Sequence, residues 1–598
     1  ANPTIIDGQG VRRGIRLQRT YSTAPAASLY LAGFTVRNGL AMGASSGTTD
    51  DTYAFGGGLL SEHASVVLED MVFVNNVSRG GTTTSAGGAG AGGAVAVNTT
   101  WGGVVARMSR VRFDGNQALG GDGAVRGGHG IGGALFTYGI QLEGADLTFL
   151  GNKATAGSTA TGGGVADGNR ADAHGAAAAF HGGSSVTLRS LTASGNVARG
   201  GNAPLGEAGG AFGGGVFVED SDLKLADAVL KANQALGGTG RNATTLAGQA
   251  WGGGLASMNA NVAVFRAQVI ANLARGGDGA VYGGAVSGGG ITNSAVTSTR
   301  RTAEVVNCII ADNEAYVGTG QLVGGGGGGL WFLGVSARVV HSTVAHNRVQ
   351  QSLLGQGVIL VNHTQPTTLG LVDSVISDHT GLVNTAALHA QAGTTVSVAR
   401  LLYANNTIND NHSLNLAGAP GTFSGLSTAI ATTDPVGYRS PGAPNYDYHI
   451  LRGSVARDLV TSLTVFNDID GDVRSGTADL GADEYLSPVD LYLRPLDATT
   501  LLSSWAVSGE LTTASDIKRY RLYLTCEAGA ASPQQVACGS SIDVGLDQTS
   551  LLLTNLTEFA HYTATLAVVD ANGQVIETSN AAVAFPTHFF TFVPLVTR

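Results

Sequence analysis

The chain has 598 residues, of which 91 are glycine and 13 are proline, and its formal net charge is −10. Glycine at about twice its ordinary share, with so little proline, excludes both collagen and a proline-rich disordered chain, and 43 % hydrophobic residues allow a large core. The negative charge and the scarcity of lysine leave no basic surface for phosphate groups, so no nucleic-acid partner is expected.

The chain opens at Ala1-Asn2-Pro3, without an initiator methionine or a basic segment followed by an apolar one. We therefore interpret the sequence as a processed or incompletely covered product. A strand-like segment begins at Thr4, so an uncapped first coil is expected there. The longest apolar runs, such as 589–596, are too short to cross a bilayer, and no transmembrane segment is expected.

A repeat organises the first four hundred residues. Each unit has a glycine cluster, a short apolar strand, an alternating strand and a third short strand that ends near an asparagine, as in 213–233 and 252–272. Units this short cannot bury an apolar face alone, so they must stack. The sequence therefore predicts an all-β fold in which residues 1–420 form a right-handed parallel β-helix of about eleven coils, with three parallel sheets around a narrow interior.

The repeated asparagine is predicted to have a structural role. A coil turns sharply between its sheets, and asparagine tolerates the left-handed conformation that such a corner requires. Stacked coils would place the amides one above another in a hydrogen-bonded ladder. The predicted members of this ladder are Asn116, Asn152, Asn196, Asn233, Asn272, Asn313 and Asn347.

The variation in unit length falls between the asparagine and the next glycine cluster, in segments such as 198–210, 235–241 and 274–280. These segments lie at the same corner of the coil, so they should stack into one lateral wall of loops. Such a wall is either a binding face or a region where glycine allows close backbone packing without a ligand, and the second interpretation is favoured.

Two stretches near the start carry a resemblance to a known family. Residues 4–10 (TIIDGQG) and 31–39 (LAGFTVRNG) resemble the entry coils of secreted bacterial right-handed parallel β-helix proteins, which include the pectate-lyase superfold and the polymorphic outer-membrane-protein repeats. The resemblance implies a secreted or cell-surface location. It implies no particular reaction, because a fold alone does not supply one.

A later stretch is similar to the closing segment of the choice-of-anchor β-helix family. The similarity lies in residues 445–454, 468–474 and 479–485, and it identifies 421–487 as the closing, or cap, segment of the β-helix. Asp468, Asp470 and Asp472 alternate within it, and oxygen ligands of this kind suit a structural calcium ion. The alternative is a cap in which Arg474 pairs with these acids.

Residues 488–598 are predicted to form a second domain, a small antiparallel β-sandwich. Short alternating strands replace the glycine clusters, and the segment resembles a fibronectin type III domain with an apolar C-terminal tail. Cys526 and Cys538 flank a short loop and are predicted to form a disulfide, as an exported protein would allow. Cys308 lies in an apolar run and is interpreted as buried.

No catalytic or cofactor-binding residues are predicted. The strand positions are mostly alanine, valine, leucine, serine and threonine, and no coil face gathers the acids and bases that polysaccharide lyases or hydrolases require. Gly128-His129-Gly130 is similar to an element of the pectin hydrolases, but in so glycine-rich a run chance explains it better. His341, His346, His379 and His389 are interpreted as isolated surface or turn residues rather than a metal site.

The sequence favours a non-catalytic extracellular or cell-surface protein with a structural or adhesive role. An uncapped first coil would offer unpaired strand edges, and the apolar tail could add to the edge of another copy and give a head-to-tail filament. The tail residues expected to do so are Phe589, Phe590, Phe592, Val593 and Leu595.

The alternative is a polysaccharide-binding or polysaccharide-cleaving, pectate-lyase-like protein that uses the loop wall. Trp101, Trp251, Trp331 and Tyr53 lie beside glycine clusters and could stack on sugar rings. The same side chains could equally fill the corners of the coils.

Overall fold

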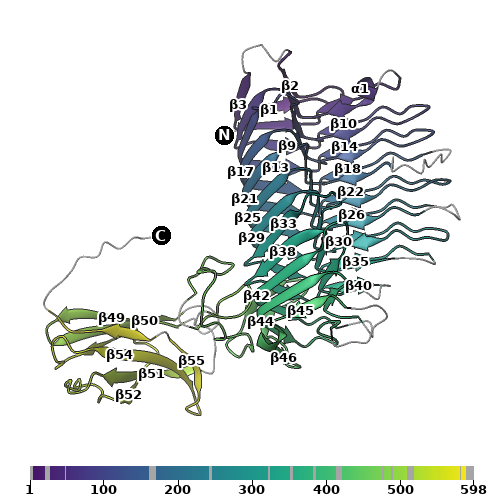
Figure 1. The fold of residues 1–598 in the computed structure, drawn as a ribbon. Helices are drawn as coiled ribbons and strands as arrows, with labels where there is room; N and C mark the ends of the chain where they lie inside the picture. Colours follow the sequence, from purple (N-terminus) through teal and green to yellow (C-terminus); the bar gives the residue numbers. More distant parts are fainter. Residues whose placement is uncertain are drawn as a thin grey trace. The chain divides into compact units, whose positions relative to one another are not determined.

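The structure is a computed structural model that describes residues 4–20, 27–46, 49–159, 170–240, 246–320, 324–350, 355–380, 385–412, 420–474, 477–485, 489–507, 517–579 and 581–587. The chain divides into two compact units, 1–484 and 485–598. In the first unit, parallel coils stack one on another from the purple start of the chain to the green closing segment (Figure 1).

One coil illustrates the path of the chain in the first unit. It runs through β24 (Val216–Glu219), the ten-residue β25 (Asp222–Lys231), β26 (Gln234–Leu236) and, after a loop, β27 (Ala250–Trp251). Each strand pairs in parallel with its equivalent in the next coil; β25, for example, pairs with β29 (Asn261–Ile270). The coils therefore build four parallel sheets, named A to D below.

Sheets A and B enclose the body of the coil. Among the described residues, sheet B has one strand in each of eleven coils: β2 (Ile15–Gln18), β7 (Leu59–Glu62), β12 (Val95–Asn98), β16 (Leu135–Tyr138), β20 (Ala178–His181), β24, β28 (Leu255–Met258), β32 (Ile291–Ser294), β37 (Leu330–Leu333), β41 (Val358–Val361) and β43 (Leu388–Ala390). Sheet A contains β1 (Thr4–Asp7), β3 (Ser28–Ala32), β4 (Phe34–Arg37), β8 (Ser65–Glu69), β9 (Val72–Val74), β13 (Val105–Asp114), β17 (Gln141–Leu150), β21 (Ser185–Ser194), β25, β29, β33 (Arg301–Val306), β34 (Ile309–Ala311), β38 (Val335–Val340), β39 (Thr343–Ala345), β42 (Thr368–Ser377), β44 (Thr395–Ala404), β45 (Thr422–Ser424) and β46 (Ala429–Thr432).

Sheets C and D are the two arms of the loop wall. Sheet C contains β5 (Leu40–Met42), β10 (Val77–Arg79), β14 (Gln117–Leu119), β18 (Lys153–Thr155), β22 (Val197–Arg199), β26, β30 (Leu273–Arg275), β35 (Glu314–Tyr316) and β40 (Arg348–Gln350). Sheet D contains β6 (Ala54–Phe55), β11 (Gly90–Ala91), β15 (Gly130–Ile131), β19 (Ala173–His174), β23 (Ala211–Phe212), β27, β31 (Val286–Ser287) and β36 (Gly325–Gly326). A short helix, α1 (Thr49–Thr52), lies in the first wall loop.

The interior of the coil is three-sided because sheet A is bent. Asp227, in the middle of β25, has φ 55°, and this left-handed residue separates two half-strands. Leu223 and Leu225 of the first half, Leu230 of the second half and Val216 of sheet B all belong to one buried cluster. The phenyl ring of Phe113 stacks on that of Phe149 at 4.6 Å between centroids, so the large side chains also form columns along the coils.

The loop wall is held together by glycine and alanine. A Cβ added to Gly237 in the arm of sheet C would lie 2.0 Å from the carbonyl oxygen of Gly248 in the arm of sheet D, so only glycine fits. The backbone bonds pass back and forth between the arms: Gly238 N–H donates to Gly209, Gly248 N–H donates to Gly238, and Gly277 N–H donates to Gly248, at 2.8–2.9 Å. The wall thus adds two sheets to the predicted three-sided coil, a feature that strand periodicity does not reveal.

The first part of the segment 421–487 completes sheet A: β45, η1 (Leu426–Thr428) and β46 lie against β44 as the last strands of the β-helix. The rest of the segment, which includes the antiparallel pair β47 (Tyr438–Ser440) and β48 (Asp447–Ile450), packs along the outer side of sheet A. Gly481 N–H donates to the carbonyl of Asp373, and Ala482 N–H donates to Thr343 Oγ1, so the segment contacts separate coils. The segment 421–487 was predicted to close the β-helix, and its described residues from 438 to 482 are bonded to the flank of the last coils.

The second unit is an antiparallel sandwich. One sheet contains β49 (Val489–Asp497), β50 (Thr500–Val507) and β53 (Ser550–Leu553), and the other contains β51 (Ile517–Cys526), β52 (Ser540–Val544), β54 (Tyr562–Asp570), β55 (Val575–Thr578) and β56 (Ala582–Ala584). Trp505 and Tyr562 lie in the buried cluster between them. The predicted fold class, a parallel β-helix followed by a small antiparallel β-sandwich, is confirmed.

Candidate functional site

The asparagine ladder runs from Asn76 to Asn347 along eight coils. From Asn76 to Asn313, each Nδ2 donates to the Oδ1 of the ladder asparagine in the next coil at 2.8–3.0 Å, and the backbone N–H of the same residue donates to the same oxygen at 2.9–3.1 Å. The structure therefore places all seven predicted members in one column: Asn116, Asn152, Asn196, Asn233, Asn272, Asn313 and Asn347. Each of them is at most 1 % exposed.

The left-handed residue at this corner is not the ladder asparagine, as the sequence suggested, but the residue before it. Ala232 and Ala271 have φ 54° and 55°, whereas Asn233 and Asn272 do not have positive φ. The physical reason is that the left-handed residue makes the turn, which frees the next side chain to point along the column. In the last coils His379 continues the column, with its Nδ1 at 3.1 Å from Asn406 Oδ1. Burial lowers the pKa of His379 to about 3.

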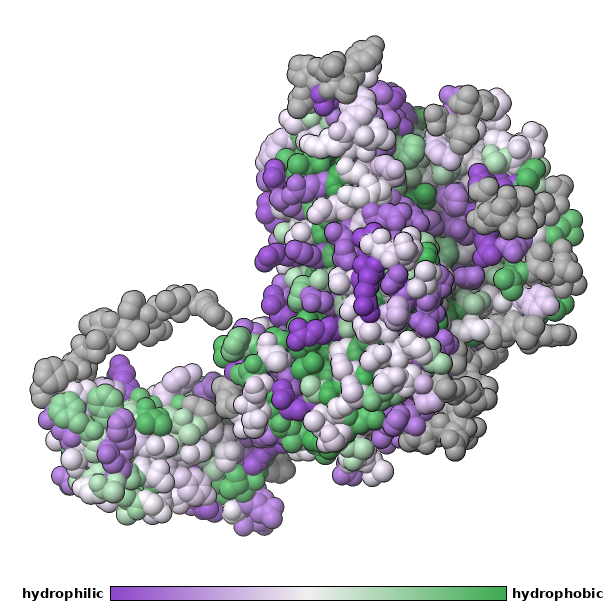
Figure 2. Space-filling model, viewed as in Figure 1, coloured by the Kyte–Doolittle hydropathy of each residue, from purple (hydrophilic) through white to green (hydrophobic). Residues whose placement is uncertain are grey.

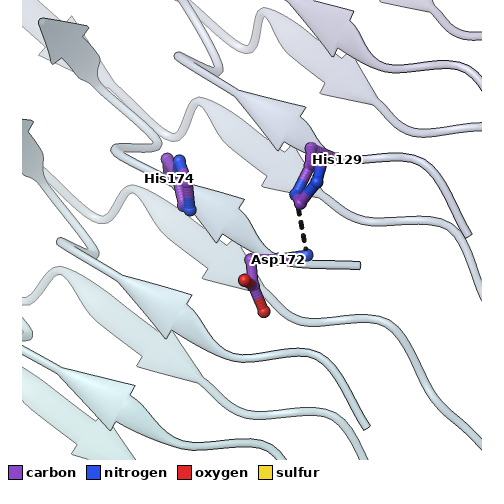
Figure 3. Close-up of side chains that lie close together, drawn as sticks. All are labelled: His129, Asp172 and His174. Carbon is purple, nitrogen blue, oxygen red and sulfur yellow. Dashed lines mark hydrogen bonds between the residues drawn. The ribbon is translucent and has the colours of Figure 1, made fainter. Parts of the chain in front are cut away.

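A second cluster lies where the loop wall meets the outer face of sheet B. Figure 3 shows three of its residues, His129, Asp172 and His174. His129 directly precedes β15; in the next coil Asp172 directly precedes β19 and His174 ends it. The backbone N–H of Asp172 donates to His129 Nδ1 at 3.1 Å. The Asp172 carboxylate accepts from the N–H of Gly210 at 2.6 Å in the following coil.

His181 and Glu219 extend this cluster. His181 ends β20 and Glu219 ends β24, so they are neighbours on adjacent strands, and His181 Nδ1 lies 2.9 Å from Glu219 Oε2. The ring of His174 stacks on that of His181 at 5.4 Å between centroids and 17° between planes. One ligand atom from each of His129, Asp172 and His174 lies within 4.8 Å of the others, and the same holds for His174, His181 and Glu219.

Burial sets the charge states in this cluster. It lowers the pKa of His174 well below the ordinary value, and the neighbouring His181 and His129 lower it further, so the imidazole is neutral with a lone pair available. Burial likewise lowers the pKa of His129 and raises that of Asp172. The hydrogen bond from His181 lowers the pKa of Glu219. The sequence interpretation of His129 as a chance motif did not foresee that three histidines and two carboxylates meet here.

The three alternating aspartates of the closing segment do not form one carboxylate cluster in the described structure. The Asp468 carboxylate accepts hydrogen bonds from the backbone N–H groups of Asp470, Asp472 and Glu484, and it thereby stabilises the turn. Asp470 Oδ2 instead bonds His449 Nε2 at 2.8 Å.

The buried cation of the closing segment is Arg474. It pairs with Glu484 at 3.2 Å and donates to the carbonyl of Gly481, as in the alternative in which Arg474 pairs with acids of the cap. His449, Asp470 and Asp483 also offer ligand atoms within 4.8 Å of one another. Their bonds account for them without an ion: Asp483 accepts from the N–H of Ile450, and His449 bonds both Asp447 and Asp470.

The remaining predicted residues are placed as follows. Cys526 and Cys538 form a disulfide with a Cα–Cα distance of 5.4 Å, and Cys308 is a buried free thiol whose pKa burial raises to about 12. Trp331 is 8 % exposed and Trp251 packs on Phe212, but Trp101 is 39 % exposed and stacks on His63. The tail residues Phe589, Phe590, Phe592, Val593 and Leu595 lie outside the described residues.

A shallow groove of about 480 Å³ crosses the outer face of sheet A from β8 to β21. Its charged lining includes Glu69, Arg107, Glu143 and Arg189, and Arg107 pairs with Glu143 at 3.0 Å. On the face of the unit seen in Figure 2, hydrophilic residues are mixed with hydrophobic ones. No helix among the described residues is long and apolar enough to cross a membrane.

Comparisons with known proteins give only remote structural similarities. The sequence matches no family profile and no curated protein. Residues of this chain align with the mannuronan C-5 epimerase AlgE6 A-module of Azotobacter vinelandii at 10 % identity, over 68 % of this chain and 91 % of that one, with a TM-score of 0.26. The third fibronectin III domain of the human KIAA0343 protein aligns at 18 % identity, over 18 % of this chain and 87 % of that one, with a TM-score of 0.15. The FN5 domain of Drosophila Lar aligns at 20 % identity over 17 % of this chain and 94 % of that one, with a TM-score of 0.13.

Proposed function

We propose that this chain is a non-catalytic structural or adhesive protein in which the β-helix serves as a stiff rod. The observation that carries the proposal is that the residues recurring from unit to unit bond one coil to the next. The asparagines form a buried column from Asn76 to Asn347, and the wall glycines pass backbone bonds between neighbouring loops. What the repeat preserves is therefore the stacking itself, which resists bending and local opening.

We place the protein outside the cell or at the cell surface. The disulfide between Cys526 and Cys538 supports this location, because structural disulfides persist in oxidising compartments and are rare in reducing ones. The resemblance of the repeat to secreted β-helix proteins points the same way. Purified secreted material with both cysteines oxidised is the expected finding, and recovery of the chain only from the reducing cytoplasm would contradict it.

We further propose that another copy of the chain assembles on the strand edges of the first described coil. In the first coil β1, β2, β3, β5 and β6 each pair with a single neighbouring strand among the described residues. Unpaired strand edges accept further strands, and the apolar tail 588–598 is the proposed donor from a second copy. A contact of this kind does not close on itself, so it gives a head-to-tail filament.

Electron micrographs of the purified full chain test the filament. Rods longer than one molecule are expected, and deletion of 588–598 should abolish them. A chain in which Phe592→Asp alone is changed serves as the milder variant, because a charge opposes burial of the tail in a partner. Polymers that persist in both variants would reject the role of the tail, and discrete monomers at every concentration would reject the filament.

A second candidate function, binding of a polysaccharide, is favoured by the groove on sheet A. Arg107 and Arg189 line it together with Glu69 and Glu143 on an exposed strand face that continues over several coils, and such side chains offer donors and acceptors to sugar hydroxyl groups. Incubation with acidic and neutral polysaccharides, followed by assays for bound sugar, reducing ends and unsaturated products, separates the candidates. Turnover that vanishes on a single Asp or Arg substitution would overturn the non-catalytic proposal.

A further inference from the structure

His174 stands in a position that most other coils fill with an apolar side chain. The second residue of each sheet D strand faces the outer side of sheet B, and in the other coils it is Phe55, Ala91, Ile131, Phe212, Trp251, Ser287 or Gly326. In β19 this residue is His174, and at the end of β20 the adjoining residue is His181. Phe217 lies 4.6 Å from the ring of His174, so the two imidazoles meet inside an apolar layer.

One nitrogen of each ring has no hydrogen-bond partner among the described residues. These nitrogens are His174 Nδ1 and His181 Nε2, and both atoms are buried. A buried polar atom without a partner costs about 1–3 kcal/mol, so two in one apolar layer require an explanation. Each atom can carry a lone pair, because Glu219 Oε2 accepts from His181 at Nδ1 and leaves Nε2 as the free nitrogen.

The same arrangement is the one by which proteins prepare histidine to bind a metal. A carboxylate that holds the far nitrogen of an imidazole fixes the tautomer and the orientation of the ring, and the near nitrogen becomes the better ligand. The ligand atoms of His174, His181 and Glu219 already lie within 4.8 Å of one another. Imidazole nitrogens are ligands suited to zinc and the neighbouring divalent transition metals, and not to calcium or magnesium.

We propose that His174 Nδ1 and His181 Nε2 bind one divalent transition-metal ion of the zinc class between the loop wall and the body of the coil, with Glu219 as the outer carboxylate that holds His181 at Nδ1. His174 comes from sheet D, and His181 comes from the sheet B strand that follows it along the chain. The ion therefore fastens the wall to the body. His129 and Asp172, which share His174 with a second group of ligand atoms, border the site on the side of the preceding coil.

Cobalt(II) is the probe for this site, because it takes zinc ligands and absorbs visible light when nitrogen and oxygen ligands surround it. The full chain, freed of metal by a chelator and dialysed, should bind about one Co²⁺ with d–d bands that added Zn²⁺ removes. The metal should also raise the thermal midpoint, since a ligand that binds only the folded state stabilises it. Absence of binding under these conditions overturns the proposal.

Two substitutions are chosen to preserve the fold. His174 pairs in register with Phe212 of the next coil, so His174→Phe introduces a side chain that this position already holds one coil later. His181 pairs in register with Tyr138 of the preceding coil, so His181→Tyr does the same. Each should weaken Co²⁺ binding by at least about 100-fold while far-ultraviolet circular dichroism stays unchanged. Glu219→Gln, which keeps a hydrogen-bond partner for His181 but removes the charge, should weaken it by about 10–100-fold.

His449→Gln is the matched control, because His449 belongs to a histidine–carboxylate group of the closing segment that shares no residue with this cluster. It should leave the Co²⁺ spectrum and the affinity as they are in the unsubstituted chain. Binding that survives His174→Phe and His181→Tyr, or that disappears with His449→Gln alone, would overturn the assignment. The readouts are independent of assembly, so failure of this site leaves the filament proposal untouched.

Discussion

Removal of one amide from the asparagine column should open the stack at that coil. Asn196 donates through Nδ2 to Asn233 Oδ1 at 2.8 Å and to the carbonyl of Phe149 at 3.1 Å, and its Oδ1 accepts two bonds from Asn152. Asn196→Ala removes all four. At about 1 kcal/mol for each net bond the loss is roughly 4 kcal/mol, and the buried backbone N–H of Asn152 is left without the acceptor that it has now.

The effect should be local, because each coil contacts only its neighbours. Chemical denaturation of the full chain followed by circular dichroism should show a lower midpoint. Amide hydrogen exchange should accelerate in the coils that contain Asn152, Asn196 and Asn233 and stay slow in distant ones. Asn202→Ala is the control: Asn202 lies on an exposed wall loop and accepts from the N–H of Thr239 at 2.9 Å, so its removal should cost less than about 1 kcal/mol.

An isosteric variant separates the lost donor from lost packing. Asn196→Asp keeps the shape but replaces the donating amide with an oxygen that faces Asn233 Oδ1, an acceptor. It should be destabilised at neutral pH and recover in acid, where the protonated carboxyl can donate again. The stabilising role of the column is refuted if the free energies of unfolding of Asn196→Ala and Asn202→Ala differ by less than about 1 kcal/mol. It is also refuted if the stability of Asn196→Asp does not recover in acid.

Two further predictions concern the wall and the closing segment. Gly237→Ala should destabilise the first unit by more than about 3 kcal/mol in denaturant titrations, because its Cβ would lie 2.0 Å from the backbone oxygen of Gly248. Gly453→Ala is the control and should be nearly neutral, because nothing lies within 4 Å of its Cβ. Equal denaturation midpoints for the two variants would contradict this prediction. Asp470 and Asp447 raise the pKa of His449 from 6.5 to about 9, so the stability that this pair contributes is complete below about pH 6.5 and is lost as the pH rises through about 9. The denaturation midpoint should fall across that interval in the unsubstituted chain and fall less in His449→Gln, and parallel pH profiles would refute the assignment.

Much of the fold can be predicted from the sequence because successive repeats make equivalent contacts. The alternation in 222–231 and 261–270 predicts strands that stack, and asparagine at each corner predicts a ladder. The left-handed residue was assigned to the recurring asparagine, whereas it is the preceding residue, which varies: it is Gly115, Gly151 and Gly195 in three coils but Ala232 and Ala271 in two others. Because no single residue type recurs there, the repeat does not mark the position. The two wall sheets were missed because glycine runs carry no alternation from which a strand could be recognised.

The histidine cluster was missed for a different reason. His129 and His174 are separated by a wall loop of variable length, so counting forward from the ladder asparagines does not align them. Counting backward from sheet B aligns His129 with Asp172, which lie six residues before Leu135 and Ala178, and it places His174 four residues before Ala178. The approach of His129 to His174 across neighbouring coils is therefore visible only when the strands and their register are known.

The asparagine column gives the cylinder an electrical direction. Backbone bonds between parallel strands point both ways and largely cancel, but every ladder Oδ1 that accepts from another ladder asparagine faces the earlier coil. Of the two N–H bonds of each Nδ2, one points toward the later coil and the other goes to a carbonyl of the earlier coil. The two ends of the stack therefore differ in sign as well as in shape. Copies laid end to end in the same sense would extend a single line of aligned dipoles, whereas copies meeting with like ends would oppose them.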